Sequence, residues 1–503
     1  MKSKKRLINF DFVLFLFVVS VCCCAGCLAA SKVINDGYWH LAMGRYMVKN
    51  HTVPSTAIGA WGSDKLSWLP QEWLFEVFSY KLFGDNVELF AWCWTVFLIV
   101  CIFAIGFGLK LHKNTTNKLL PLSVFGALAA LLTVSFTHPR PQLVSAILFA
   151  IYLFALNNCL KSTKSMKWYI YVCFLIISVL WANFHAGTAI LGYMIPLALA
   201  LILTVTKKLD VLKSYFEIDN SKETIDKLSW IALVMLVGVF ITPNGISGFI
   251  YPIKSMCDDT MLSVITEWQS PSFGDFTHFV VFYIPFFAFV FYVFFRRKTK
   301  CDFVKTLIVC MIFALSFMHI RILIYLYISL MICTVSDLPE IRININLKQK
   351  GFMSIVMSVS MLIMFGVMFS NIVTTDYEQM EGYNNTEFFD TVKQYAGDRM
   401  YNYYDIGSLC QYYDIPVFVD ARYDPFSNNR MKEVIKLVYG DSHSDEFIDI
   451  MDKYDFTSIL DLKDSHTIEW AKVHGYVKMG ELSVGSSSDS SSQTVYYFYV
   501  KKS

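Results

Sequence analysis

Residues 10–44 read FDFVLFLFVVSVCCCAGCLAASKVINDGYWHLAMG, and this stretch decides the fold class. Its first part, residues 10–30, is almost entirely apolar, and about 20 apolar residues are enough for a helix to span a bilayer. The basic segment MKSKKR precedes it and the polar segment INDGYWHLAMG (34–44) follows it. The segment CCCAGCLAA makes cleavage of a signal peptide conceivable, but such peptides usually have a shorter apolar core. We therefore favour an uncleaved first span, with Asp36 and His40 where the chain leaves the membrane.

Apolar runs of the same kind recur along the chain. It has 503 residues, of which 55% are hydrophobic and 17% are charged. This composition is too apolar for a soluble protein of this size, and the apolar residues are concentrated in long blocks. We expect an α-helical polytopic membrane protein with about eleven transmembrane helices, at residues 10–30, 87–109, 119–136, 142–158, 168–184, 187–206, 229–246, 278–295, 303–318, 322–338 and 351–371.

The charges of the connecting loops predict the orientation. Alternate loops carry the cationic segments KSKKR, LKLHKNTTNK, KSTKSMK, TKKLDVLKSYFEIDNSKETIDK, RRKTK and RININLKQK. Because cationic loops stay in the cytoplasm, the N-terminus is expected inside and the segment after the last span outside. The net charge of +2 does not indicate a partner, but the absence of a dense basic cluster with interleaved aromatic residues argues against nucleic acid. The expected localisation is the plasma membrane.

The segment after the last span has a different composition and predicts a soluble domain. RMYNYY, PVFVDAR, TSILDL and TVYYFYVKK are typical of strands, whereas NRMKEVIKLVYG and EFIDIMDKY are typical of helices. We therefore divide the chain into a transmembrane domain, residues 1–371 with a first external loop at 31–86, and an extracytoplasmic α/β domain, residues 372–503.

Two short turns on the expected outer side have the same form. THPRP contains His138 and Arg140, and MHIR contains His319 and Arg321. A guanidinium at a membrane surface suits a phosphate, because its planar fork binds two oxygens. A helix cap with a lipid headgroup contact explains each arginine equally well. His185, in the turn WANFHAG, lies on the same side.

The external carboxylates are the other candidates for chemistry. Asp36 follows the first span, Glu72 occurs in LPQEWLFEV, and Glu267 occurs in ITEWQSP. A carboxylate near a lipid phosphate can act as the general base that deprotonates an acceptor hydroxyl. The alternative is an interfacial helix whose Trp faces lipid and whose Glu faces water. We favour this alternative for Glu267, keep both open for Glu72, and favour function for Asp36.

The first external loop resembles that of a group of bacterial and archaeal multi-spanning proteins with the pattern D-x-D-x-W-W-H-L, G-R, a Pro-containing stretch, and E-W-L. The matching residues here are Asp36, Trp39, His40, Leu41, Gly44, Arg45, Pro54, Trp68, Glu72, Trp73 and Leu74. Ile34 occupies the first acidic position. The segments HPRPQ (138–142), LWANFHAG (180–187), TPNGISGFIYP (242–252), ITEWQSP (265–271) and VDARYDPF (419–426) resemble later parts of the same group.

That group is similar to the GT-C superfamily of membrane glycosyltransferases. The resemblance implies a sugar donor carried on polyprenyl phosphate, an external active site, and Asp36 as the base or a metal ligand. No cofactor is certain, but Asp36 with His40 or Glu72 could hold a divalent metal. The hypothesis for the catalytic residues is Asp36 and Glu72. The residues expected to contact the lipid phosphate or the sugar are His40, His138, Arg140, His185, Glu267, His319 and Arg321.

The resulting hypothesis is a glycosyltransferase that moves a sugar to a glycan, lipid or protein acceptor of the cell envelope. A single displacement would invert the anomeric centre, whereas retention usually needs a second carboxylate as nucleophile. Three alternatives stay open: a transporter or flippase of lipid-linked glycans, a polymerase or ligase of such glycans, and a non-catalytic envelope assembly protein. A transporter typically has ionisable residues deep within its spans, whereas the charges here lie mostly at one face.

Overall fold

The chain forms two compact units. The computed structural model describes residues 9–29, 35–135, 139–162, 165–208, 211–255, 266–295, 300–341, 343–426, 430–484 and 494–502. One unit, here named the helical unit, comprises residues 1–31 and 93–369; the other, named the α/β unit, comprises residues 32–92 and 370–503. The α/β unit thus contains the first external loop as well as the tail, whereas the sequence analysis grouped residues 31–86 with the transmembrane domain.

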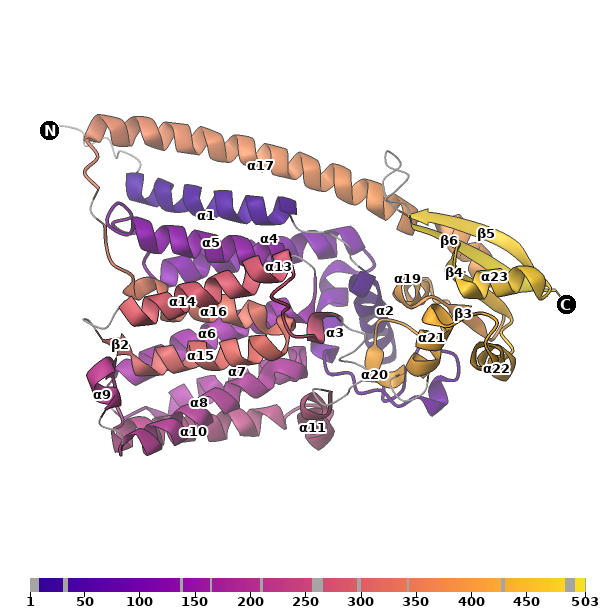
Figure 1. The fold of residues 1–503 in the computed structure, drawn as a ribbon, viewed down its shortest axis with the longest axis horizontal. Helices are drawn as coiled ribbons and strands as arrows, with labels where there is room; N and C mark the ends of the chain where they lie inside the picture. Colours follow the sequence, from indigo (N-terminus) through magenta and orange to yellow (C-terminus); the bar gives the residue numbers. More distant parts are fainter. Residues whose placement is uncertain are drawn as a thin grey trace. The chain divides into compact units, whose positions relative to one another are not determined.

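The helical unit is a bundle of long helices (Figure 1). Its main helices are α1 (Phe10–Ala29), α4 (Val87–Gly108), α5 (Leu119–Ser135), α6 (Pro141–Lys161), α7 (Trp168–Phe184), α8 (Ala186–Thr206), α10 (Lys222–Val239), α11 (Gly245–Ser255), α14 (Ile284–Phe295), α15 (Phe303–Met318), α16 (Leu323–Cys333) and α17 (Leu347–Tyr383). The connections contain α9 (Leu212–Tyr215), η2 (Thr266–Trp268), α13 (Phe276–His278), η3 (Phe279–Tyr283), η5 (Ile320–Ile322), η6 (Val335–Asp337) and the paired strands β1 (Phe216–Glu217) and β2 (Cys301–Asp302).

Each expected span coincides with a helix or a series of helical turns. Among the described residues, seven segments are long and apolar enough to cross a membrane, and three apolar helices are shorter: Leu119–Ser135, Trp168–Phe184 and Phe303–Met318. Helix α10 covers the remaining expected span, but it begins at Lys222 and ends at Val239, earlier than residues 229–246. The side chain of Ser221 accepts from the backbone N–H of Thr224 and fixes this earlier start. The polytopic helical fold is confirmed.

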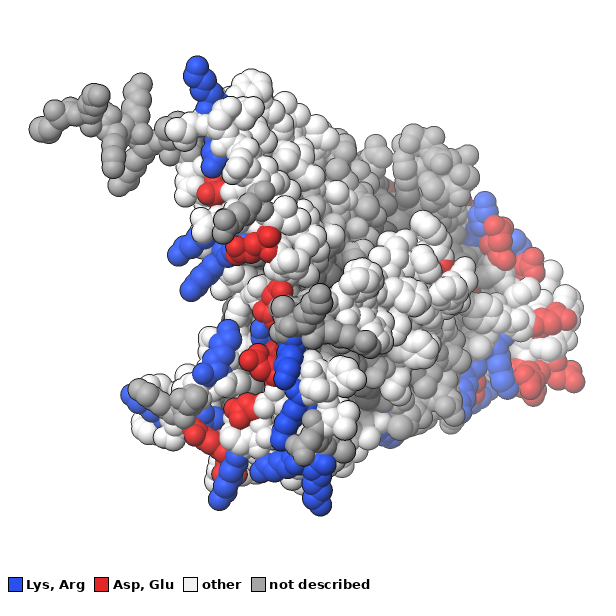
Figure 2. Space-filling view, turned by 60° about the vertical axis from the view of Figure 1, so that its left-hand side comes forward, with Lys and Arg blue, Asp and Glu red and all other residues white. Residues whose placement is uncertain are grey.

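Charged side chains are concentrated at one end of the helical unit. Figure 2 shows blue and red atoms gathered at the end that carries α9, β1 and β2, whereas the flanks of the helices are largely white. Apolar flanks suit helices that face lipid. Close helix contact inside the bundle depends on a small residue, because a Cβ at Gly26 of α1 would overlap the side chain of Thr133 on α5.

The α/β unit combines two helices of the first loop with the tail. The loop contributes α2 (Asn35–Asn50), η1 (Ser63–Lys65) and α3 (Trp73–Phe83). The tail contributes α18 (Thr386–Tyr395), β3 (Met400–Asn402), α19 (Tyr404–Tyr412), α20 (Tyr423–Phe426), α21 (Arg430–Tyr439), α22 (Asp445–Tyr454), β4 (Ser458–Leu462), α23 (His466–Val473), β5 (Tyr476–Val484) and β6 (Thr494–Lys501). The sheet order is β3-β4-β6-β5, with β3 and β4 parallel and the other pairs antiparallel. The expected α/β architecture of the tail is confirmed.

One expected strand, PVFVDAR (416–422), is absent. Of this segment only Val417 forms a bridge, and its partner is Ala60 of the first loop. The side chain of Asn402 satisfies the neighbouring backbone instead: it accepts from the N–H of Phe418 at 2.7 Å and donates to the carbonyl of Val419 at 2.8 Å. An amide that pairs with the backbone in this way replaces the hydrogen bonds of a strand ladder.

Arginines hold the first loop against the tail. Arg422 is buried and pairs with the buried Asp420 at 2.7 Å, and its guanidinium also donates to the carbonyl of Ile58 at 2.8 Å and stacks over Trp68. Arg45 of α2 donates to the carbonyl of Tyr412 at 2.6 Å. Contacts between residues more than 360 positions apart therefore join residues 32–92 to the tail.

Candidate functional site

A histidine and two glutamates converge inside the α/β unit, and we name His40, Glu72 and Glu76 the carboxylate–histidine cluster. His40 lies on α2, Glu72 caps the N-terminus of α3, and Glu76 follows one turn later in α3. Residues four apart lie on the same face of a helix, so both glutamates can face α2. Gly44, one turn after His40, lets the backbone of α3 at Glu76 approach α2 more closely than a Cβ would allow.

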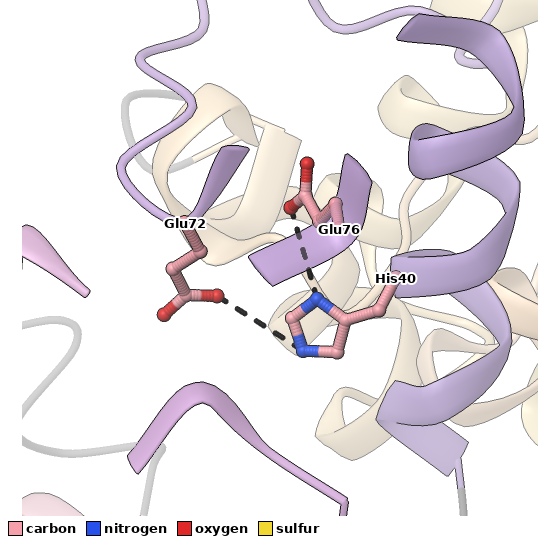
Figure 3. A group of neighbouring side chains, drawn as sticks. All are labelled: His40, Glu72 and Glu76. Carbon is pink, nitrogen blue, oxygen red and sulfur yellow. Dashed lines mark ion pairs between the residues drawn. The ribbon is translucent and has the colours of Figure 1, made fainter. Parts of the chain in front are cut away.

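The imidazole of His40 lies between the two glutamates (Figure 3). Its Nε2 is 4.0 Å from Oε2 of Glu72, and its Nδ1 is 3.7 Å from Oε1 of Glu76. Taking one ligand atom from each residue, all three atoms lie within 4.8 Å of one another. These separations exceed those of hydrogen bonds, so the cluster leaves room between its polar atoms.

Glu76 is the most strongly perturbed member of the cluster. Its side chain is completely buried, and neither carboxylate oxygen has a hydrogen-bond partner. Burial raises the pKa of the Glu76 carboxyl well above its usual range, and the negative charge of Glu72 raises it further, while Arg422 opposes the shift. A buried carboxylate is costly unless a proton or a cation neutralises it. The cluster can therefore hold either a proton or a positively charged ligand.

Asp36 lies on the same helix but outside this cluster. It occupies the first turn of α2, one turn before His40, and is partly exposed. Its electrostatic neighbours come from the tail: after burial, the charge of Asp36 is the largest cause of the raised pKa values of Asp405 and Tyr404. The structure thus brings the expected residues His40 and Glu72 together, but it places Asp36 beside α19.

The helical unit carries a second polar group of residues, here named the arginine cluster: Arg140, Gln142, Glu267, Trp268, His319 and Arg321. Its centre is Arg321, whose guanidinium lies 5.4 Å from the ring centroid of Trp268. With its amide oxygen turned toward this guanidinium, Gln142 accepts from Nε of Arg321 at 3.0 Å. Among the described residues no carboxylate forms an ion pair with Arg321. Its positive charge is therefore held by neutral groups.

The other members of the arginine cluster are arranged differently. Arg140 forms an ion pair with Glu267, so its charge is already compensated. His319 is buried, and its Nδ1 lies 2.8 Å from the carbonyl oxygen of Trp268. Because only a protonated Nδ1 can donate to that carbonyl, Nε2 is the free ring position, and it has no hydrogen-bond partner. Arg321 and His319 are thus the two expected residues best placed to bind a ligand.

Of the remaining expected residues, His185 lies in a buried hydrogen-bond network, and His138 lies outside the described residues. His185 is buried in a network in which its Nδ1 is 2.9 Å from Oγ of Ser145 and 3.0 Å from Oγ1 of Thr188. This network joins α6, α8 and the turn before α8. His138 and Ile34 lie outside the described residues.

The sequence analysis did not identify Glu76, Gln142 or Trp268 as site residues. A signal for Glu76 was present, because WLFEVF places one acid, four residues after Glu72, in an otherwise apolar helix. No comparable signal marked Gln142, since a single amide beside Pro141 is unremarkable until Arg321 is placed against it.

Of the three comparisons with known proteins, the search of solved structures gave a match, and that match concerns the fold. No protein-family model matches the chain, and no curated protein matches it in sequence. A crystal structure of the Archaeoglobus fulgidus oligosaccharyltransferase, tethered to an acceptor peptide, matches with a TM-score of 0.50 and 11% identity, over 99% of this chain and 74% of that one. The chain has the GT-C fold. This confirms the expected fold class; at this identity, the likeness extends to the fold alone.

Proposed function

We propose that this chain is an integral membrane glycosyltransferase that takes a sugar from a polyprenyl-phosphate carrier. The acceptor is a glycan, lipid or protein of the cell envelope on the extracytoplasmic face, and the reaction inverts the anomeric centre. The observation that carries this proposal is Arg321, a guanidinium at a helix junction of a GT-C fold that is held by Gln142 and Trp268 rather than by a carboxylate.

In this proposal the arginine cluster binds the phosphate of the donor. A guanidinium without a carboxylate partner retains the charge and the donor groups that a phosphate needs. Arg140 is the weaker candidate, since Glu267 already neutralises it. Gln142 and Trp268 hold the guanidinium of Arg321 in place, which supports the choice of this group of residues over an isolated arginine.

Asp36 is the proposed general base. It is partly exposed, so an acceptor hydroxyl can reach it, whereas Glu76 is completely buried. The carboxylate removes the hydroxyl proton while the oxygen attacks the anomeric carbon, and the carrier phosphate leaves with the bonding electrons. Glu72 is largely buried beside His40 and is assigned to the carboxylate–histidine cluster rather than to the base.

The test is sugar transfer by the full-length protein in lipid nanodiscs, with radiolabelled polyprenyl-phosphate sugars and an envelope extract as acceptor. Asp36→Asn and Arg321→Gln are each expected to reduce the transfer rate at least 100-fold, in the range for loss of general base or electrostatic catalysis. The matched controls are Asp398→Asn, an exposed acid of the tail, and Arg399→Gln, an exposed ion-pair partner of Asp455. Wild-type rates in both Asp36→Asn and Arg321→Gln would refute the proposal.

A further inference from the structure

The carboxylate–histidine cluster has a feature that the proposed sugar transfer does not use. Glu76 contributes two buried carboxylate oxygens without hydrogen-bond partners, whereas Asp420 and Asp461, two other buried acids of the same unit, have partners. Asp420, for example, is paired with Arg422, and Asp461 accepts from the hydroxyl of Thr467 and the N–H of Leu462. Leaving a buried carboxylate unsatisfied costs several kcal/mol. A cation bound next to Glu76 would remove this cost.

Among the described residues, no cationic side chain fully neutralises Glu76. Arg422 is the cation whose charge acts on Glu76, yet its guanidinium is already committed to Asp420 and to the carbonyl of Ile58. His40 faces Glu76 through Nδ1, but at 3.7 Å the two do not form a hydrogen bond. Figure 3 shows one oxygen of Glu76 directed toward the imidazole of His40, whose other ring nitrogen faces Glu72.

We propose that His40, Glu72 and Glu76 bind one divalent metal ion of the class that includes Mn²⁺, Fe²⁺ and Zn²⁺. One imidazole nitrogen with two carboxylate oxygens is a donor set that these ions accept, whereas a site made only of oxygens would favour Mg²⁺ or Ca²⁺. The assignment differs from the one that the family resemblance implied, because it does not include Asp36.

The geometry requires only a small adjustment. Metal–ligand bonds of about 2.0–2.2 Å put ligand atoms roughly 3–4 Å apart. The three atoms of the cluster already lie within 4.8 Å of one another, so rotation of the glutamate side chains closes the site. The backbones are held in place, since the contact at Gly44 fixes α3 against α2. The two positive charges of the ion would neutralise the two glutamates, which removes the cost of burying them.

Metal binding can be measured without any sugar donor, so the result does not depend on the proposed function. The full-length protein is stripped with EDTA and titrated with Mn²⁺, and free Mn²⁺ is followed by electron paramagnetic resonance. A parallel titration follows the stabilisation of the protein against heat, with Zn²⁺ as a second probe. We expect one ion per chain, displaced by EDTA, and a higher melting temperature with the ion bound.

Two variants locate the ion. Glu76→Gln has the shape of the protonated acid but no charge, and His40→Gln removes the imidazole; each is expected to weaken Mn²⁺ binding at least tenfold. Asp461→Asn, which neutralises another buried acid of the same unit, serves as control and keeps wild-type binding. If Glu76→Gln fails to fold, Glu72→Gln provides the same measurement. The proposal is overturned if the wild type binds no ion, as expected if Glu76 simply holds a proton, or if both variants bind like the wild type.

Discussion

The two polar clusters of this protein stabilise their charged side chains in different ways. In the α/β unit, the carboxylate–histidine cluster and the Asp420–Arg422 pair are buried, so each charge depends on a specific partner. In the helical unit, the arginine cluster lies at helix ends, and the side chains of Arg140 and Glu267 are 31% and 41% exposed. The comparison teaches that a buried charged side chain needs a partner of opposite charge or a proton. A partly exposed charged side chain can instead bind a ligand that exchanges with solvent.

The largest effect is expected where burial is complete. Asp420→Ala leaves Arg422 buried without its counter-ion, which costs about 3–5 kcal/mol. The loss is measured as faster hydrogen exchange of β3 and of the segment after α19 in the full-length protein. The double variant Asp420→Leu with Arg422→Met removes both charges and is expected to recover most of the loss. A cost below about 1 kcal/mol for Asp420→Ala would show that burial is not what distinguishes the two clusters.

A second buried acid of the α/β unit predicts a pH dependence. Burial raises the pKa of Asp461 from 3.8 to about 6. Since the folded state holds this proton more tightly than the unfolded state, the contribution is fully present below pH 3.8 and is lost as the pH rises through about 6. The expected loss is about 2–3 kcal/mol.

The measurement is hydrogen exchange of strand β4, corrected for the intrinsic dependence of exchange on pH. The variant Asp461→Asn cannot ionise, so its stability between pH 4 and pH 6 is expected to change much less than that of the wild type. Equal pH profiles for the two proteins would contradict the assignment to Asp461. The result also separates this acid, which has hydroxyl and N–H donors, from Glu76, which has none.

Much of the fold could be predicted from the sequence, because its signals are local. A run such as residues 10–30 predicts its helix without reference to the rest of the chain, and the structure confirms helix α1 there. Likewise, the apolar periodicity of the tail helices depends on residues a few positions apart. The prediction of a strand at PVFVDAR (416–422) was wrong because its conformation depends on residues distant in the sequence, namely Asn402 and Ala60.

The candidate site could be predicted only in part, because its geometry depends on distant pairs. Asp36, His40 and Glu72 stand out through their position after a span and their place in a family pattern. Which of them meet depends on how α3 packs on α2, and this packing rests on Gly44 and on contacts of the first loop with the tail. Likewise, the role of Gln142 as a hydrogen-bond acceptor could not be predicted, because it depends on the distant residue Arg321.

An intermediate effect is expected at Arg321. Arg321→Gln should weaken binding of farnesyl phosphate about tenfold, which corresponds to about 1.4 kcal/mol, because the guanidinium is the charge available to the phosphate. Arg140→Gln is the matched control in the same cluster and should weaken binding less, since Glu267 already compensates Arg140. Both are measured by calorimetry on the full-length protein in nanodiscs. A larger effect of Arg140→Gln than of Arg321→Gln would reverse the assignment of the phosphate contact.

The smallest effect is expected for the Arg140–Glu267 pair itself. Both side chains are about a third or more exposed, so water screens their attraction and an interaction of about 0–1 kcal/mol is expected. A double-mutant cycle with Arg140→Gln and Glu267→Gln, followed by unfolding in sodium dodecyl sulfate, measures this coupling directly. A coupling free energy above about 2 kcal/mol would mean that this pair contributes as much as the buried ion pairs of the α/β unit. A weak coupling instead agrees with a partly exposed pair whose two charges are screened by water at the ends of helices.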